Sequence, residues 1–169
     1  MIGYKYNDGG RAAYLKAHPQ ATLGLRDCVT RAIAIATGLP YSYVLRRLTR
    51  AKRAKFGEHR RDASRGMNKK AYGPIMASAF ALEKVQFAGR ARPTFTEAHE
   101  KFGTCVVKTT KHVVALKDGK VQDTWDSRGY LWQDYGDSYN KRFRERKAMT
   151  VWVPQTKLYE QLLAGMATS

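Results

Sequence analysis

The chain has 169 residues, and its 31 lysines and arginines against 14 aspartates and glutamates give a formal net charge of +17. This length suits one domain with a substantial core, and the excess of positive charge favours a polyanionic partner. The two cysteines have neither metal-ligand spacing nor the pattern of a disulfide framework, and no apolar run is long enough for a signal peptide or a membrane span. We therefore expect a soluble cytoplasmic protein without a metal or cofactor.

The first informative element is a short helix that begins at a cysteine. Asp27 is a favourable N-cap, and Gly38 is the expected left-handed residue just past the C-terminus. Nearly all residues between them are apolar, which predicts a helix buried in the core. A helix N-terminus favours thiolate over thiol, so Cys28 is a candidate nucleophile. The alternative is that Cys28 is a small buried apolar residue.

A strongly basic segment follows at residues 46–70, where eleven lysines and arginines accompany only two acidic residues. Its first half belongs to a helix predicted over residues 41–56, with Val44, Leu45, Leu48 and Phe56 toward the core and its arginines outward. Residues 57–70 are predicted to be a mobile loop, so the segment forms a basic insertion in the domain. Its candidate nucleic-acid-binding residues are Arg46, Arg47, Arg50, Lys52, Arg53, Lys55, Arg60 and Arg61.

The remaining elements predict an α+β fold. Further helices are expected over residues 72–84 and, from the capping-box spacing of Thr94 and Glu97, after Pro93. Strands are expected over residues 104–109, 112–117, 120–125, 130–133 and 149–153, and a closing helix over residues 156–166. We therefore predict a single domain over residues 1–169, in which N-terminal helices, the cysteine helix among them, pack on a C-terminal antiparallel sheet.

Two of these strands are predicted to form a hairpin that places a carboxylate beside a histidine. Asp118-Gly119 is a typical two-residue turn between them. With that turn, Asp123 lies on the same face as His112, one diagonal step away and within reach of a hydrogen bond. A three-residue turn with a bulge would bring Asp126 there instead, so both carboxylates remain candidates.

The order of a cysteine at a helix start, a histidine at a strand start and an aspartate on the next strand resembles the papain-like thiol hydrolases. In that family the histidine begins a His-(Ala/Val)-Val strand, as in His112-Val113-Val114, and the orienting residue often precedes a small hydroxyl residue and Trp, as in Asp123-Thr124-Trp125. Residues 7–11, 27–38 and 41–44, with the tail of the hairpin, more closely resemble small bacteriophage proteins with this peptidase-like core.

This resemblance implies a papain-like fold and a set of catalytic residues. The implied triad is Cys28, His112 and Asp123, with Asp126 as the alternative third member. In the family, a glutamine about six residues before the cysteine belongs to the oxyanion hole. That position is Thr22 here and the nearest glutamine is Gln20, so these two residues are the oxyanion candidates, together with the Cys28 backbone N–H.

A second basic cluster, at residues 141–147, adds Lys141, Arg142 and Arg144 to the candidate nucleic-acid-binding residues. It follows an aromatic-rich stretch that contains Tyr130, Trp132, Tyr135 and Tyr139. Aromatic rings among basic side chains can stack on unpaired bases while the charges hold phosphates. The alternative, favoured for Tyr130 and Trp132, is that these rings are core residues of a strand.

Two functions from different classes follow from the sequence. In the first, the protein is a phage-type thiol hydrolase, a peptidase, isopeptidase or amidase, that acts on a host protein in the cytoplasm of the infected bacterium. In the second, the peptidase-like fold is a catalytically weak or inactive scaffold whose basic surface binds nucleic acid or a ribonucleoprotein such as the ribosome. The sequence leaves the oligomeric state open.

Overall fold

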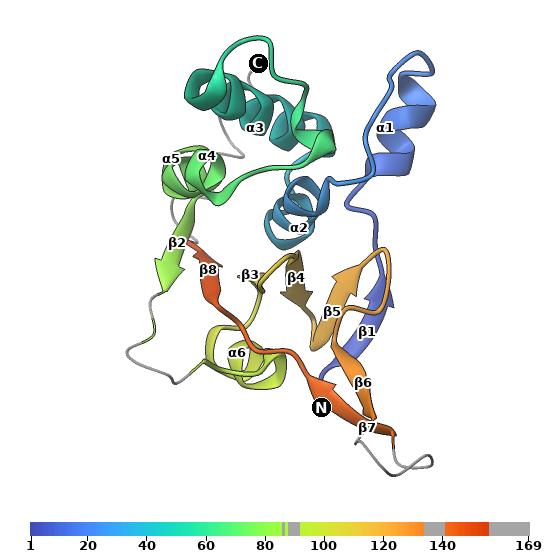
Figure 1. Ribbon diagram of the computed structural model, residues 1–169, viewed down its shortest axis with the longest axis vertical. Helices are drawn as coiled ribbons and strands as arrows, with labels where there is room; N and C mark the ends of the chain where they lie inside the picture. Colours follow the sequence, from blue (N-terminus) through green and yellow to red (C-terminus); the bar gives the residue numbers. More distant parts are fainter. Residues whose placement is uncertain (86, 88–91, 134–140, 156–169) are drawn as a thin grey trace.

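The computed structural model describes residues 1–85, 87, 92–133 and 141–155 (Figure 1). It contains a six-stranded mixed sheet with the strand order β1-β5-β4-β3-β8-β2. These strands span Gly3–Tyr6 (β1), Leu82–Val85 (β2), Cys105–Lys108 (β3), Val113–Lys117 (β4), Lys120–Asp123 (β5) and Thr150–Pro154 (β8). A separate two-stranded ribbon pairs β6 (Gly129–Gln133) with β7 (Lys141–Glu145). The predicted α+β class is confirmed.

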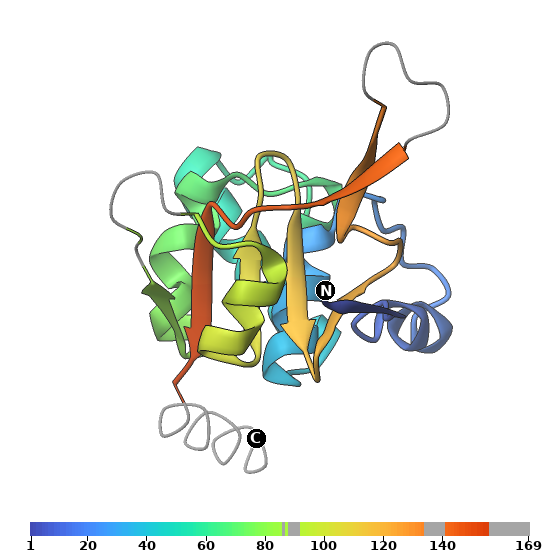
Figure 2. The ribbon, with the colours of Figure 1, turned by 90° about the horizontal axis from the view of Figure 1, so that it is seen from below.

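Helices cover both faces of the sheet (Figures 1 and 2). The helix α2 (Cys28–Thr37) packs across β4, and the longer α3 (Tyr41–Phe56) packs behind α2. The helix α6 (Phe95–Phe102) covers the opposite face. Because side chains alternate along a strand, β3 and β4 contribute to a core on each side. Val106, Val113 and Ala115 belong to the core on the α2 side, and Cys105, Val107, Val114 and Leu116 belong to that on the α6 side.

The predicted bounds of the two N-terminal core helices are confirmed. The helix α2 runs from Cys28 to Thr37 between Asp27 and Gly38, whose φ of 72° is the left-handed conformation expected of a terminating glycine. The helix α3 begins at Tyr41 and ends at Phe56. The capping box of α6 is also present, with the Thr94 hydroxyl accepting from the Glu97 N–H. None of the helices in the described ranges is long and apolar enough to cross a membrane.

The predicted antiparallel sheet is wrong at one edge. The strand β1 pairs in parallel with β5, with Gly3 opposite Lys120 and Tyr6 opposite Asp123. It is followed by a short helix, α1 (Arg11–Ala17), which the sequence analysis also missed. Both elements are short and half exposed, so neither has the apolar periodicity by which such elements are recognised.

The helix predicted over residues 72–84 is also wrong beyond Phe80. Three short turns, α4 (Lys69–Tyr72), η2 (Gly73–Ile75) and α5 (Met76–Phe80), replace it. Ala81 then adopts a left-handed conformation with a φ of 50°, which ends the helix. The chain continues as β2, which pairs with β8, a strand about seventy residues away in the sequence. Pairing with β8 therefore overrides the local preference of Leu82 and Glu83 for helix.

Residues 57–70 were predicted to form one mobile loop, but they contain short helical turns and buried residues. They contain η1 (Ala63–Arg65) and the start of α4, and both Ala63 and Ser64 are fully buried. The Lys52 Nζ donates to the Asp62 and Gly66 carbonyls at 3.1 and 2.8 Å. This basic segment is therefore fastened to α3.

Several predictions concern residues, or side chains, that the structure does not describe. The closing helix over residues 156–166, Tyr135 and Tyr139 lie outside the described residues. The backbones of β6 and β7 are described, but the side chains of residues 130–133 and 141–144 are not. The nucleic-acid-binding roles assigned to Lys141, Arg142 and Arg144 therefore stay predictions.

Candidate active site

Cys28 lies at the edge of a cavity of about 860 Å³ between the start of α2, α1 and the β4–β5 hairpin. The cavity is also lined by Arg31, His112 and Trp125. The thiol is partly exposed because α2 begins there, whereas the rest of the helix, from Val29 to Thr37, is buried. The apolar body of α2 thus fixes its first residue at the cavity wall.

His112 lies just before β4, and its backbone is held by a tight turn. Its carbonyl accepts the Thr109 N–H at 2.8 Å and the Thr109 hydroxyl at 3.2 Å. Its Nε2 lies 2.5 Å from the Asp123 Oδ2. With Nε2 engaged by the carboxylate, Nδ1 is the ring nitrogen left to interact with the Cys28 thiol, whose pKa His112 lowers.

The hairpin register decides which aspartate contacts the histidine. Asp118 and Gly119 form the predicted two-residue turn, with φ values of 53° and 69°, and Lys117 pairs with Lys120 across it. This register brings Asp123 to His112. Asp126, the alternative third member, instead forms an ion pair of 2.7 Å with Arg128.

Asp123 is 3% exposed, and every contact that it makes favours its charged form. Its carboxylate accepts the Ser127 hydroxyl at 2.9 Å and the Thr124 N–H at 2.7 Å, besides contacting His112. Burial acts to raise the pKa of Asp123, but the hydrogen bond and charge of His112, with the other two donors, hold this pKa below its usual value. Asp123 is therefore an anion that can orient and stabilise an imidazolium.

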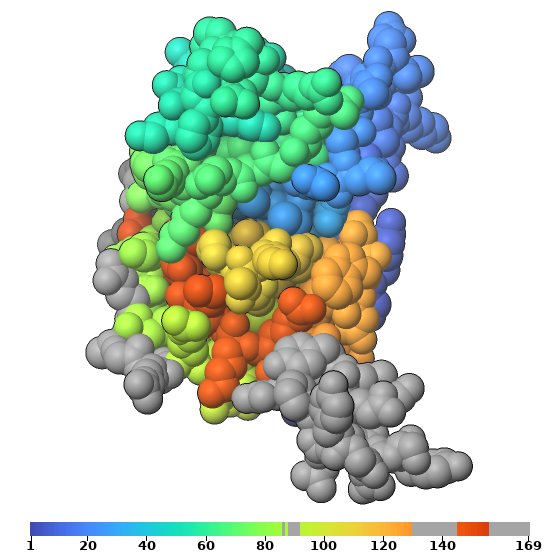
Figure 3. Space-filling model, in the orientation of Figure 1, coloured from blue at the N-terminus to red at the C-terminus, as the bar shows by residue number. Residues whose placement is uncertain are grey.

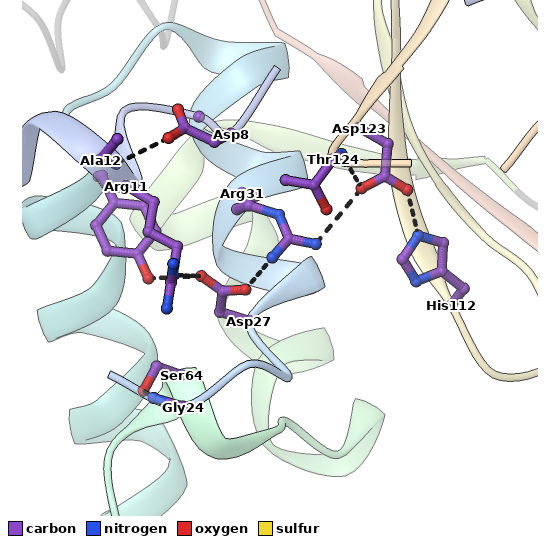
Figure 4. A network of polar contacts seen from close by, with 12 residues as sticks. Asp8, Arg11, Ala12, Gly24, Asp27, Arg31, Ser64, His112, Asp123 and Thr124 are labelled. Carbon is purple, nitrogen blue, oxygen red and sulfur yellow. Dashed lines mark hydrogen bonds and ion pairs between the residues drawn. The ribbon is translucent and has the colours of Figure 1, made fainter. Parts of the chain in front are cut away.

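A buried arginine links Asp123 to the cysteine helix (Figure 4). One guanidinium nitrogen of Arg31 contacts Asp27, and the other lies 3.4 Å from the Asp123 Oδ1. Asp27 is fully buried and also accepts the Tyr41 hydroxyl at 2.8 Å, with the Arg11 Nε 3.1 Å away. This network was not predicted, because Arg31 stands in the sequence only as one of the few polar residues of an apolar helix. Its only local signal was the (i, i+4) spacing of Asp27 and Arg31.

Cys28 and His112 each favour the charged form of the other. Burial alone would raise the pKa of Cys28, but the hydrogen bond and charge of His112, the Val113 N–H and the charge of Arg31 together lower it below its ordinary value. Burial would lower the pKa of His112, yet the hydrogen bonds and charges of Asp123 and Cys28 raise it to about 9. These shifts favour a thiolate and an imidazolium near neutral pH. By contrast, burial raises the pKa of the second thiol, Cys105, to about 12.

Trp125 covers the histidine on its solvent side. Its ring centroid lies 5.1 Å from that of His112, and the guanidinium of Arg146, which follows β7, lies 5.6 Å from the Trp125 ring. Trp125 is 45% exposed and lines the cavity. The indole therefore limits the access of water to the bond between His112 and Asp123.

The oxyanion candidates Gln20 and Thr22 do not join this group. Both are exposed, and Thr22 lines a different cavity, beside α3. The Asp27 carboxylate makes no capping bond to the first turn of α2, because it is engaged with Arg31 and Tyr41. The backbone N–H groups at Cys28 thus remain the better oxyanion donors.

The predicted basic residues fall into two groups in space. Arg46, Arg47, Arg50 and Lys55 are exposed along α3, and Arg53 lies half-buried on the same helix. Arg60 and Arg61 instead line a second cavity together with Lys52, Arg26 and Arg65. Arg26 belongs to the segment that leads into α2, and its membership of this cationic group was not foreseen from the sequence.

Comparisons of the chain with protein-family models, with curated proteins and with solved structures found no match. Within the described residues, no group of three or more His, Cys, Asp and Glu side chains is placed to hold a metal ion. The function must therefore be argued from the chemistry of the side chains themselves.

Proposed function

We propose that the protein is a thiol hydrolase that cleaves an amide, peptide or isopeptide bond by acyl transfer to Cys28. One observation carries this proposal: Cys28 and His112 line the same open cavity, the His112 Nε2 lies 2.5 Å from the Asp123 carboxylate, and the imidazole lowers the pKa of the Cys28 thiol. The arrangement has the three roles of nucleophile, general acid and base, and orienting carboxylate. The cysteine at a helix start, the histidine just before β4 and the aspartate at the end of β5 also support the resemblance to papain-like enzymes.

In the first half of the reaction, the Cys28 thiolate attacks the carbonyl carbon, and the carbonyl π electrons move onto oxygen. The backbone N–H at the start of α2 stabilises this oxyanion. The His112 imidazolium then gives its Nδ1 proton to the departing amine as the C–N bond breaks. The products of this half are a free amine and a thioester on Cys28.

In the second half, neutral His112 takes a proton from water as the water oxygen attacks the thioester. The C–S bond then breaks, which releases a carboxylic acid and restores the thiolate and the imidazolium. The imidazolium has a raised pKa of about 9, so the charged pair persists from the lowered pKa of Cys28 up to about pH 9. Amide hydrolysis should decline above that pH, since the leaving amine then lacks its proton donor.

The decisive test compares the two cysteines of the same chain. Iodoacetamide should alkylate Cys28 at pH 7 at least about a hundredfold faster than Cys105, because the thiol of Cys105 is fully buried and its pKa is raised. The rates are measured by mass spectrometry of the digested protein, with Cys105→Ala and Cys28→Ser as the single-thiol controls.

A second measurement follows acylation of the thiol. p-Nitrophenyl acetate should acetylate Cys28 and release p-nitrophenolate in a burst, which Cys28→Ser abolishes. Equal slow alkylation without a burst would exclude an activated thiol.

A second candidate function is the binding of nucleic acid by the exposed face of α3. Arg46, Arg47 and Arg50 are exposed on this face, and no described carboxylate forms an ion pair with them. Arg46 and Arg50 also line the cavity beside α3 that contains Glu58 and Asp62. A row of cations on one helix attracts phosphates with a strong dependence on salt. This role is compatible with catalysis, because α3 lies on the far side of α2 from the sheet (Figure 1).

We expect a mixed-sequence oligonucleotide to bind at low salt, and Arg46→Glu/Arg47→Glu to weaken that binding about tenfold or more. Fluorescence anisotropy measures both. Lys5→Glu/Lys120→Glu, which makes the same change in net charge on β1 and β5, is the matched control and should weaken binding less. Binding that is equally sensitive to the two double variants would locate no interface on α3.

A further inference from the structure

A cationic cavity of about 780 Å³ adjoins the Cys28 cavity. Its basic lining residues are Arg26, Lys52, Arg60, Arg61 and Arg65, with His59 beside them. None of the described residues that line it is acidic. The two acidic residues of this segment, Glu58 and Asp62, line a different cavity against α3.

The backbone builds this cavity by joining two distant segments. The Arg26 N–H donates to the Ser64 carbonyl at 3.0 Å, and the Gly24 N–H donates to the Ser64 hydroxyl at 2.7 Å. The approach is so close that a side chain at Gly24 would place its Cβ 2.6 Å from the Arg65 Cγ. Figure 3 shows the green segment that follows α3 lying against the blue N-terminal part of the chain, and Figure 4 shows Ser64 beside Gly24.

The charges gathered here are poorly neutralised. Within the described ranges, no carboxylate forms an ion pair with Arg26, Arg61 or Arg65. The Lys52 ammonium is fixed in place by two backbone carbonyls. Like charges held together repel one another, and a bound anion relieves this repulsion. The charge of this cavity therefore favours the binding of anionic groups.

The position of the cavity indicates which anions it would bind. Leu25 and Arg26 line both cavities, so a single ligand can extend from Cys28 into the cationic site. Leu25 is 85% exposed, and the exposed Tyr6 and Trp125 also line the Cys28 cavity. Exposed apolar side chains around a reactive thiol suit the side chains of an extended polypeptide.

Resting on the proposed hydrolase function, we propose that the substrates of Cys28 are polypeptides with an acidic segment next to the scissile acyl bond, whose carboxylates bind in this cationic cavity. Arginine pairs with carboxylate in a bidentate manner, and several such pairs would set both affinity and the position of the bond over the thiol. A polypeptide is favoured over nucleic acid because the site is continuous with a thiol whose chemistry requires an acyl group.

The test uses chloroacetamide peptides, in which the Cys28 thiolate displaces chloride and forms a thioether. Two peptides carry three glutamates on one side or the other of the electrophile, and matched peptides carry three glutamines. One of the two glutamate peptides should label Cys28 about tenfold faster than its glutamine partner at low salt. This advantage should disappear in Arg61→Glu/Arg65→Glu and persist in Arg46→Glu/Arg47→Glu, which makes the same change in net charge on α3.

The outcomes separate this inference from the function on which it rests. If iodoacetamide labels Cys28 rapidly but the glutamate and glutamine peptides react alike, only the acidic-substrate proposal is overturned. The same holds if both double variants lose the advantage equally, or if Arg61→Glu/Arg65→Glu abolishes oligonucleotide binding without affecting any peptide. If iodoacetamide itself reacts slowly with Cys28, the hydrolase proposal fails first.

Discussion

Replacing Arg31 with methionine should destabilise the protein by about 3 kcal/mol, since removal of one partner from a buried ion pair leaves an uncompensated charge. Methionine fills a similar volume but leaves Asp27 and Asp123, 0% and 3% exposed, without their shared cation. Arg11 and Tyr41 still contact Asp27, which keeps the expected loss at the lower end of the range for such substitutions. Urea unfolding followed by circular dichroism measures the change in free energy.

Arg47→Met is the matched control, because Arg47 is exposed on α3 and the polar and ring contacts that it makes with described residues are to the Tyr43 side chain. Its effect should stay within about 0.5 kcal/mol. If the two variants lose the same stability, Arg31 does not hold the buried carboxylates together. Arg31→Met should also slow alkylation of Cys28, because Asp123 loses a contact that positions it and Cys28 loses a nearby positive charge.

Replacing His112 with alanine should slow alkylation of Cys28 by about a hundredfold at pH 7. The imidazolium provides the main contributions that lower the pKa of the thiol, and burial, which opposes them, remains after the substitution. The thiolate fraction therefore falls from a large share to about a percent. As the pH rises toward the new, higher pKa of Cys28, the variant should recover and the difference should shrink.

Rates of iodoacetamide labelling between pH 5 and 10 measure this effect. Wild-type Cys28 should react at a nearly constant rate from neutral pH upward, whereas the variant should gain about tenfold per unit of pH. Asp126→Asn, the control at the carboxylate that pairs with Arg128, should retain the wild-type profile. A profile unchanged by His112→Ala would mean that the imidazole does not activate the thiol.

Local rules were sufficient for the elements that carry the proposed triad. Gly38 ends α2 in a left-handed conformation, the apolar run after Asp27 marks where this helix begins, and Asp118-Gly119 defines the hairpin register. Because that register decides which face each side chain occupies, the choice of Asp123 over Asp126 as the contact of His112 was accessible from the sequence.

Contacts between distant segments could not be predicted in the same way. The strand β1 depends on pairing with β5, more than one hundred residues later. The helix predicted beyond Phe80 became a strand because β8 lies beside it. No feature of the sequence around Arg31 indicates that it contacts Asp123. The cationic cavity forms only because the backbone contact between Arg26 and Ser64 brings Arg26 close to Arg65. Each of these features depends on contacts between residues far apart in the sequence, and local sequence patterns do not reveal such contacts.

The sheet separates the only two sulfur atoms that could react with each other. Cys28 lies on the α2 side, and Cys105 belongs to the core on the α6 side. An internal disulfide requires Cα atoms within about 7 Å of each other and side chains that point toward each other. The sheet lies between the two cysteine side chains, so they do not meet this requirement. Peroxide should therefore convert Cys28 to a sulfenic acid that has no resolving thiol in its own chain. Its repair depends on an external reductant such as glutathione.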